Sequence, residues 1–240
     1  MADLYSNTGD GYVQSSTMSA WADARDDTEG SVATGGASSG NFTAVTRFSS
    51  RRGGNTYRVV RSFMYFDTSG ITGTVSAATI KIRGYSGNDG SVIAVKSTAF
   101  GGDGGTALAT TDLDAITGYS AGSSLAGNAT IYGPQILTSS WSTSSYNDFT
   151  GTSDLRADMQ NNNVVIICFM DYTNDYLNVA PTSDGFFNCG AYYTEYSSSS
   201  VHPYILYTEM YGNTVTGIGR SSIKKVIGVA TANIDKVIGV

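Results

Sequence analysis

Residues 164–170 read VVIICFM, seven consecutive apolar residues without a charge, and this stretch decides the fold. A short continuous apolar run is typical of a strand that is covered on both faces. Residues 58–66, RVVRSFMYF, are similarly rich in β-branched and aromatic residues and lie between turn-forming segments. We therefore expect a strand covered on both faces at residues 164–170 and a further strand at residues 58–66.

A third stretch, residues 78–85 (ATIKIRGY), alternates apolar and polar side chains as a strand with one solvated face does. The expected core-facing set is Ala78, Ile80 and Ile82, and the expected solvent-facing set is Lys81 and Arg83. Further strands are predicted at residues 91–96, 191–196 and 204–211.

One helix is predicted, at residues 155–160, because Thr152, Ser153 or Asp154 can cap its first turn and residues 161–163 (NNN) stop it. Strands at a spacing of about ten residues indicate an antiparallel β-sandwich or jelly roll. The predicted fold class is thus all-β, with at most one short helix and an extended C-terminal β arm.

The composition excludes several classes of protein. Hydrophobic residues make up 40% of the 240 residues, enough for a core, whereas charged residues make up only 14%. The net charge of −6 disfavours a nucleic-acid groove lined with Lys and Arg. There is no apolar run of eighteen residues, so no membrane span is expected. The start, MADLY, lacks the basic and apolar regions of a signal peptide.

The chain ends in a repeat: residues 223–229 (IKKVIGV) return as residues 234–240 (IDKVIGV). Such β-branched segments prefer extended structure and present apolar side chains to a neighbour. We therefore expect a β body over residues 1–211, a linker over 212–222 and a docking arm over 223–240; a disordered tail is the alternative. The expected docking residues are Ile223, Val226, Ile227, Val229, Ile234, Val237, Ile238 and Val240.

Part of the chain resembles a known family. Residues 61–71 (RSFMYFDTSGI), residues 77–82 (AATIKI) and residues 202–206 (HPYIL) resemble the core strand, the following strand and the closing strand of DNRLRE-type β-sandwich modules. The repeated ending looks like the Ile-x-Lys-Val-x-Gly-Val tails of predicted structural proteins of tailed phages. The resemblances imply a non-catalytic, surface-displayed module, often near polysaccharide.

Groups that could perform catalysis or bind a metal are few. The one histidine, His202, precedes Pro203 and is expected to be a turn residue. Cys168 lies in the apolar run and is expected to be a buried free thiol, although a disulfide with Cys189 stays open. No cofactor is expected. The weak candidates for calcium ligands are Asp171, Asp175 and Asp184, for which solvated loop acids are the alternative.

Tyrosines crowd the last two predicted strands. They are Tyr192, Tyr193, Tyr196, Tyr204, Tyr207 and Tyr211. Because strand residues alternate between faces, some of these rings are expected to point outward, where they can stack on sugar rings or pack against another subunit. Cross-strand pairs that only stabilise the sheet are the alternative.

These observations predict a non-enzymatic structural protein of a tailed-phage virion, displayed as a fibre, decoration or tail-associated subunit. It would be made in the host cytoplasm and located in the released particle. The expected partners are further copies of the chain or other virion proteins, with host surface polysaccharide as a further contact. An extracellular filament or adhesin subunit that assembles by strand addition is the alternative, followed by a carbohydrate-binding module.

Overall fold

The computed structural model describes residues 1–50, 54–210, 225–226 and 229–230, and the fold is all-β, as predicted. Twelve strands form one sheet in the order β1-β12-β6-β11-β4-β5-β10-β7-β8, with β2 pairing β3 and β5, and β9 pairing β6. The strands are β1 (Ala2–Tyr5), β2 (Gly11–Gln14), β3 (Val32–Gly35), β4 (Ser39–Ser50), β5 (Gly54–Asp67), β6 (Thr74–Asn88), β7 (Val92–Lys96), β8 (Ile131–Ile136), β9 (Tyr146–Thr150), β10 (Val164–Met170), β11 (Gly185–Tyr192) and β12 (Tyr204–Met210).

Short helical segments connect the strands. They are α1 (Trp21–Arg25), α2 (Ser153–Asn161), the 3-10 turns η1 (Phe100–Gly102), η2 (Thr110–Asp112), η3 (Thr138–Ser140) and η5 (Ser199–Val201), and the π-helical turn η4 (Tyr172–Tyr176). The predicted helix is α2, and the side chain of Thr152 accepts its capping hydrogen bond from the backbone N–H of Leu155. Helix α1 was not predicted. None of the helices among the described residues is both long and apolar enough to cross a bilayer.

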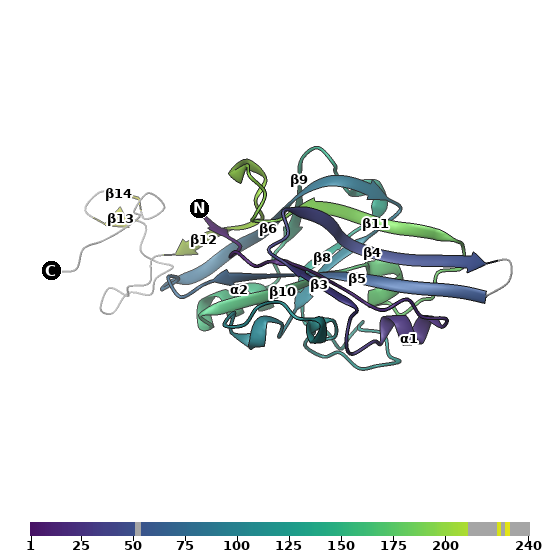
Figure 1. The fold of residues 1–240 in the computed structure, drawn as a ribbon. Helices are drawn as coiled ribbons and strands as arrows, with labels where there is room; N and C mark the ends of the chain where they lie inside the picture. Colours follow the sequence, from purple (N-terminus) through teal and green to yellow (C-terminus); the bar gives the residue numbers. More distant parts are fainter. Residues whose placement is uncertain (51–53, 211–224, 227–228, 231–240) are drawn as a thin grey trace.

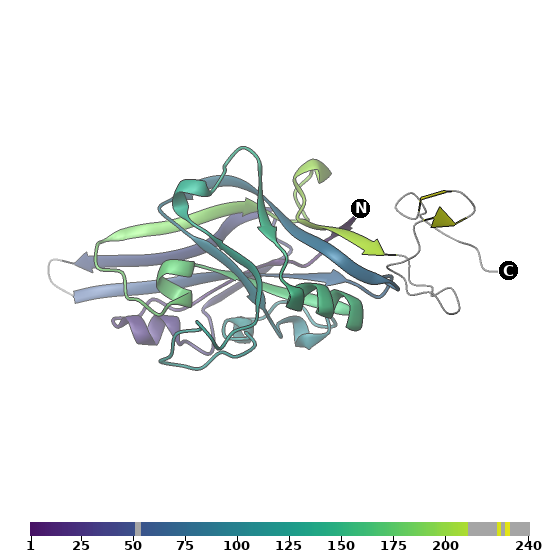
Figure 2. The ribbon, with the colours of Figure 1, turned by 180° about the vertical axis from the view of Figure 1, so that it is seen from behind.

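The sheet curls, and it has a packed core on each side. Its long strands β4, β5, β6 and β11 run side by side (Figure 1). Helix α1 packs into one core through Trp21 and Ala24, and α2 packs into the other through Leu155 and Met159. Strands β8 and β9 come into contact although β8 pairs with β7 and β9 pairs with β6. The view from behind shows the teal segment that contains them crossing over the longer strands (Figure 2). The prediction of a sandwich or jelly roll stays a prediction.

Burial on both faces is confirmed for β10, and β5 shares it. Successive residues of β10 belong to different clusters: Ile167 and Phe169 pack in the core enclosed by the curl, and Ile166 and Cys168 pack on the opposite face. We call the first cluster the inner core and the second the outer core. The outer core lies under α1 and the loops that follow β7 and β10. At about 25 cal/mol per Å² of apolar surface, two such cores are the main source of stability.

The alternating stretch at 78–85 lies within β6 as predicted. Ala78, Ile80 and Ile82 are buried in the inner core, and Lys81 and Arg83 point to the other side, where they are half-buried.

The strand predicted at 191–196 is wrong in its bounds. The strand is β11, which ends at Tyr192, and a turn follows it. Two glycines and Asn188 give residues 185–190 a low β propensity. The segment still forms a central strand, because its pairing with β4 and β6 outweighs this low propensity.

Two short pieces of the C-terminal arm are described. β13 (Lys225–Val226) and β14 (Val229–Ala230) pair antiparallel with each other. The predicted docking residues Val226 and Val229 face each other in this register. Ile223, Ile227, Ile234, Val237, Ile238 and Val240 lie outside the described residues, as does the linker.

Candidate functional site

The predicted tyrosines are split between the core and the surface. Tyr193 is fully buried in the inner core, so its prediction as a contact residue is wrong. Its hydroxyl lies 2.6 Å from the hydroxyl of Ser62 and donates to the carbonyl of Asn41 at 3.1 Å. Tyr207 packs against the inner core and is half-buried. Tyr211 lies outside the described residues.

The other predicted tyrosines belong to two ring clusters on the solvent side of the sheet. In one, Tyr192 contacts Tyr85 with ring centroids 5.3 Å apart and Tyr196 at 4.5 Å. In the other, Tyr204 contacts Tyr5 at 5.4 Å and Tyr146 at 5.3 Å. We call these six rings the tyrosine face.

The two ring clusters share one side of β6. Tyr85 continues the outward alternation of Lys81 and Arg83 along that strand. Lys81 lies opposite Tyr204 in the register, and its ammonium group contacts the Asp148 carboxylate at 2.5 Å. Tyr85 is 38% exposed and Tyr5 48% exposed. The tyrosine face thus offers aromatic rings beside charged hydrogen-bonding groups.

The loop at 193–203 joins the two clusters. The Tyr146 hydroxyl donates to the carbonyls of Ser200 and His202, at 2.9 and 3.1 Å. The His202 ring Nε2 lies 2.7 Å from the carbonyl of Tyr196. His202 therefore fixes a loop, consistent with its prediction as a turn residue.

The three candidate calcium ligands do not form a site. The buried Asp171 carboxylate accepts hydrogen bonds from the backbone and hydroxyl of Ser91 and from the backbone of Asn174. Asp184 lies on the surface and pairs with Arg47 at 2.7 Å. Among the described residues there is no cluster of three or more His, Cys, Asp or Glu side chains that could hold a metal ion. The loop acids bind protein donors instead.

Asp175 takes part in a buried ion-pair network. Arg61, on β5, and Asp175, on η4, form a bidentate pair in which both N–O distances are 2.7 Å, and both side chains are at most 1% exposed. Arg61 also donates to the backbone carbonyls of Leu113 and Arg25. Burial alone would lower the pKa of Arg61, but the Asp175 carboxylate outweighs burial and raises it.

A second arginine completes the network. Arg25, on α1, donates to the backbone carbonyl of Asp175 at 3.0 Å and pairs with Asp26 at 2.6 Å. The ring of Tyr119 lies 5.2 Å from the Arg25 guanidinium and 5.3 Å from that of Arg61. Burial is the main cause that raises the pKa of Tyr119 to about 12. The network joins α1, β5, η4 and the loop at 113–119, and it is a structural feature of the outer core.

A buried carboxylate not singled out by the sequence is Asp10, which is 0% exposed. It accepts hydrogen bonds from the hydroxyls of Ser6 and Thr194. Burial is the largest cause that raises its pKa, and the neighbouring Glu195 adds to the effect. Because Asp10 has no exposed surface, it is placed to hold the N-terminal segment against the loop after β11 rather than to meet a substrate.

The two cysteines are free thiols, and both are buried. Cys168 lies in the outer core and Cys189 in the inner core. Burial raises the pKa of the Cys189 thiol to about 12. Both thiols are therefore unreactive packing residues, as predicted for Cys168.

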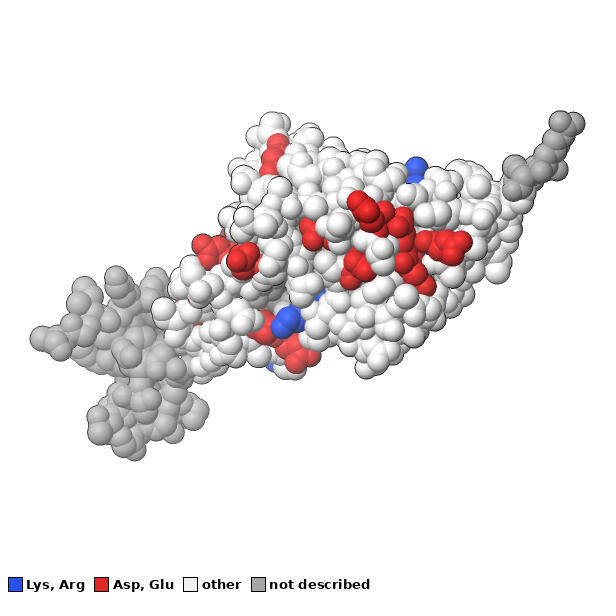
Figure 3. Space-filling model, turned by 60° about the horizontal axis from the view of Figure 1, so that its bottom comes forward, with Lys and Arg blue, Asp and Glu red and all other residues white. Residues whose placement is uncertain are grey.

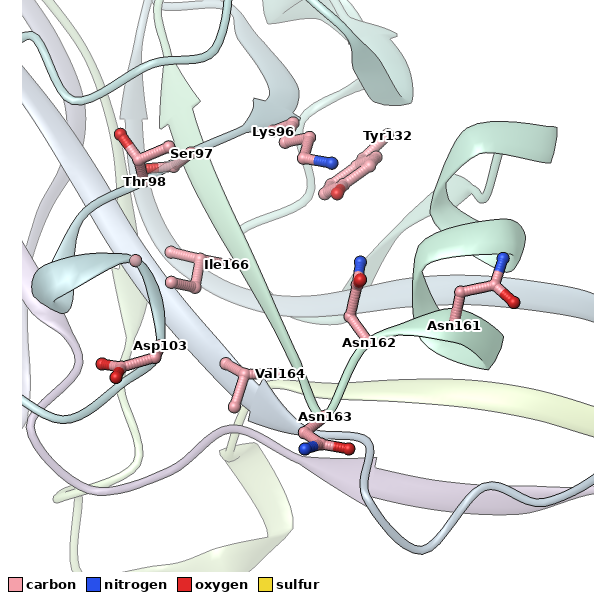
Figure 4. Close-up of a pocket in the computed structure, with 11 residues that line it drawn as sticks. Lys96, Ser97, Thr98, Asp103, Tyr132, Asn161, Asn162, Asn163, Val164 and Ile166 are labelled. Atoms are coloured by element: carbon pink, nitrogen blue, oxygen red, sulfur yellow. The ribbon is translucent and has the colours of Figure 1, made fainter.

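A half-open pocket of about 630 Å³ lies at the beginning of β10 (Figure 4). We call it the edge pocket. Its lining is Lys96, Ser97, Thr98, Gly102, Asp103, Tyr132, Asn161, Asn162, Asn163, Val164 and Ile166. In Figure 4, Lys96, Tyr132 and the end of α2 lie on one side of β10, and Thr98 and Asp103 lie on the other.

One wall of the edge pocket is ordered by Asp158. Its carboxylate accepts hydrogen bonds from the Lys96 ammonium at 2.8 Å, from the buried Tyr132 hydroxyl and from the Asn162 side-chain amide at 3.0 Å. Burial opposes the charged form, but the hydrogen bonds from Lys96 and Tyr132 outweigh it and lower the pKa of Asp158. The sequence showed no signal for this pocket, because its lining comes from parts of the chain that are far apart, around residues 96–103, 132 and 161–166.

No protein-family model matches the chain, and no curated protein matches it. The resemblances to DNRLRE-type modules and to phage tails therefore stay predictions.

Proposed function

We propose that the chain is a non-enzymatic structural protein of a tailed-phage virion, in which the β body is displayed and the C-terminal arm docks on neighbouring protein. The observation that carries this proposal is the division of charge between the two parts. Residues 1–210 contain ten Lys and Arg against nineteen Asp and Glu, and residues 211–240 contain four against one, giving net charges of −9 and +3.

Opposite charges favour docking of the arm on a body like its own. Acidic side chains gather on the side of the molecule that carries α1 and α2 (Figure 3). At physiological salt the attraction acts over about 8 Å, so it steers the arm and fixes its orientation more than it adds affinity. The apolar residues of the two repeats supply the buried surface that holds a docked arm. An extracellular filament or adhesin subunit uses the same two parts and is the alternative.

Removing the arm is expected to abolish assembly while the body stays folded. Light scattering after size-exclusion chromatography should give assemblies for the full chain and monomers for a chain that ends at residue 222, with the same far-UV circular dichroism per residue. A matched control is Leu137→Ser, which removes an apolar side chain that is 49% exposed on the body. Assemblies of unchanged size from the shortened chain would refute the docking role of the arm.

Carbohydrate binding is a second candidate function, and the tyrosine face favours it. Aromatic rings with hydroxyl tips beside Lys81, Arg83 and Asp148 combine stacking surface with hydrogen-bonding groups, which suits the faces and edges of sugar rings.

On a glycan array, binding by the full chain is expected to fall about fivefold in Tyr192→Ala, since loss of one ring contact costs about 1 kcal/mol. The matched control, Tyr172→Ala, removes a ring that stacks on Tyr176 away from the tyrosine face and should leave binding unchanged. An array without bound glycans would eliminate this second function and leave the structural proposal standing.

A further inference from the structure

The edge pocket contains an open sheet edge. β10 pairs with β5 from Val164 onward, but its pairing with β7 begins only at Ile167, opposite Lys96, where β7 ends. Beyond that point the backbone N–H of Ser97 donates to the carbonyl of Ile166 at 3.0 Å. In the described part of the chain, no strand continues along the first residues of β10 on this side.

The direction of the free peptide groups follows from antiparallel geometry. In such a ladder the N–H and C=O of one residue point to the same side, and residues two apart point the same way. Because the carbonyl of Ile166 points toward the end of β7, the peptide groups of Val164 point into the edge pocket as well. Exposed sheet edges of this kind are templates for an added strand.

The walls of the edge pocket suit a strand. Val164 supplies a half-buried apolar side chain beside the nearly buried Ile166, and Asn161, Asn162 and Asn163 place exposed amides at one end. Loop residues around η1 stand on one side and the end of α2 on the other, as Figure 4 shows. Ile166 already accepts the Ser97 N–H, and the peptide groups of Val165 point toward β5, so the open edge offers the N–H and C=O of Val164 to an added strand.

We propose that the edge pocket receives the C-terminal arm of a second copy of this chain as an added β-strand. This inference rests on the proposed function and names the acceptor of the arm. Each repeat of the arm has consecutive β-branched residues, KKVIGV and DKVIGV, so an added strand places apolar side chains toward both walls. The net charge of +3 on residues 211–240 complements a body of −9, and Asp103 is an exposed carboxylate in the pocket wall.

The arm leaves the body at the end of β12, which lies beside β1 and β6 rather than beside β10. The donor strand and the acceptor edge are therefore separate sites on one chain, and each copy can give its arm to one neighbour while it accepts the arm of another. Such head-to-tail contacts form a ring when the rotation closes and a filament when it does not.

The first test blocks the acceptor in the full-length chain. Thr98→Arg places a long cation in the edge pocket from an exposed position. We expect the dissociation constant of the assemblies to rise about tenfold or more, equivalent to about 1.4 kcal/mol, when light scattering is followed over a dilution series. The control is Thr72→Arg, which adds the same cation at an exposed position outside the pocket and should assemble like the unaltered chain.

The second test identifies the occupant. In the full chain with Asn163→Cys and Val229→Cys, mild oxidation should give covalent multimers that disappear on reduction, because the native thiols are buried. A cross-link within single chains would show that the arm occupies its own body, which overturns the second-copy proposal.

The two proposals fail in different ways. If the chain that ends at residue 222 stays monomeric while Thr98→Arg assembles normally, the arm docks elsewhere and only the acceptor is wrong. If the shortened chain assembles like the full chain, the proposed function itself fails. A full-length chain that stays monomeric at every concentration also overturns the second-copy acceptor.

Discussion

Arg61→Met is expected to destabilise the body by about 3–5 kcal/mol, because it leaves the Asp175 carboxylate buried without its bidentate partner. This is a large share of the roughly 5–15 kcal/mol that holds a typical domain folded. The remaining cation, Arg25, approaches the Asp175 carboxylate only to 3.5 Å. The midpoint of urea unfolding should fall strongly with an unchanged slope.

Two further variants separate loss of the ion pair from loss of an arginine side chain. Arg47→Met breaks the surface pair with Asp184, whose side chain is 43% exposed, and should cost less than about 1 kcal/mol. Arg61→Met combined with Asp175→Asn removes the unpaired charge and should be more stable than Arg61→Met alone. Equal losses for Arg61→Met and Arg47→Met would contradict the assigned role of the network.

The network also gives Arg61 a structural role beyond the ion pair with Asp175. Arg61 is the buried charged residue of β5, whereas Arg58 is half-buried and Asp67 is exposed. Its guanidinium donates hydrogen bonds to the backbone carbonyls of Leu113 and Arg25. It therefore positions the segments that cover the outer core, and it also neutralises the charge of Asp175. In the structure, this arginine is thus part of the folding core.

The sequence predicted the features that depend on local patterns. In the apolar run at Val164–Met170 nearly every residue is buried, and in the alternating stretch Ala78, Ile80 and Ile82 are buried, so each sequence pattern follows the burial of its strand directly. The cap at Thr152 is equally local, since the donor and acceptor lie three residues apart. Such signals are strong because several neighbouring residues carry them together.

Features that depend on distant contacts could not be predicted. Arg61 and Asp175 are 114 positions apart, and each alone is typical of a solvated residue. Helix α1 has five residues and no side-chain cap, so it gives little local signal and is stabilised by packing of Trp21 and Ala24 in the outer core. The edge pocket depends on where β7 ends relative to β10, a relation that only the register defines.

The burial of Tyr193 was likewise not predictable from the sequence. A tyrosine can lie at a solvated surface, or it can lie in a core where its hydroxyl has a hydrogen-bond partner. Tyr193→Ala is expected to cost about 3–5 kcal/mol, since it removes a fully buried ring that contacts Phe42 in the inner core and the hydroxyl that donates to the Asn41 carbonyl. Tyr193→Phe keeps the ring and should cost about 1–3 kcal/mol for the lost hydroxyl.

The neighbouring ring supplies the control for this last expectation. Tyr192→Ala removes a half-buried ring of the tyrosine face and should cost about 1–2 kcal/mol for its two ring contacts, to Tyr85 and Tyr196. Urea unfolding followed by circular dichroism should therefore show a clearly larger loss of stability for Tyr193→Ala than for Tyr192→Ala or Tyr193→Phe. If Tyr192→Ala were as damaging as Tyr193→Ala, the tyrosine face would be part of the folding core and would not be free to contact a ligand or subunit.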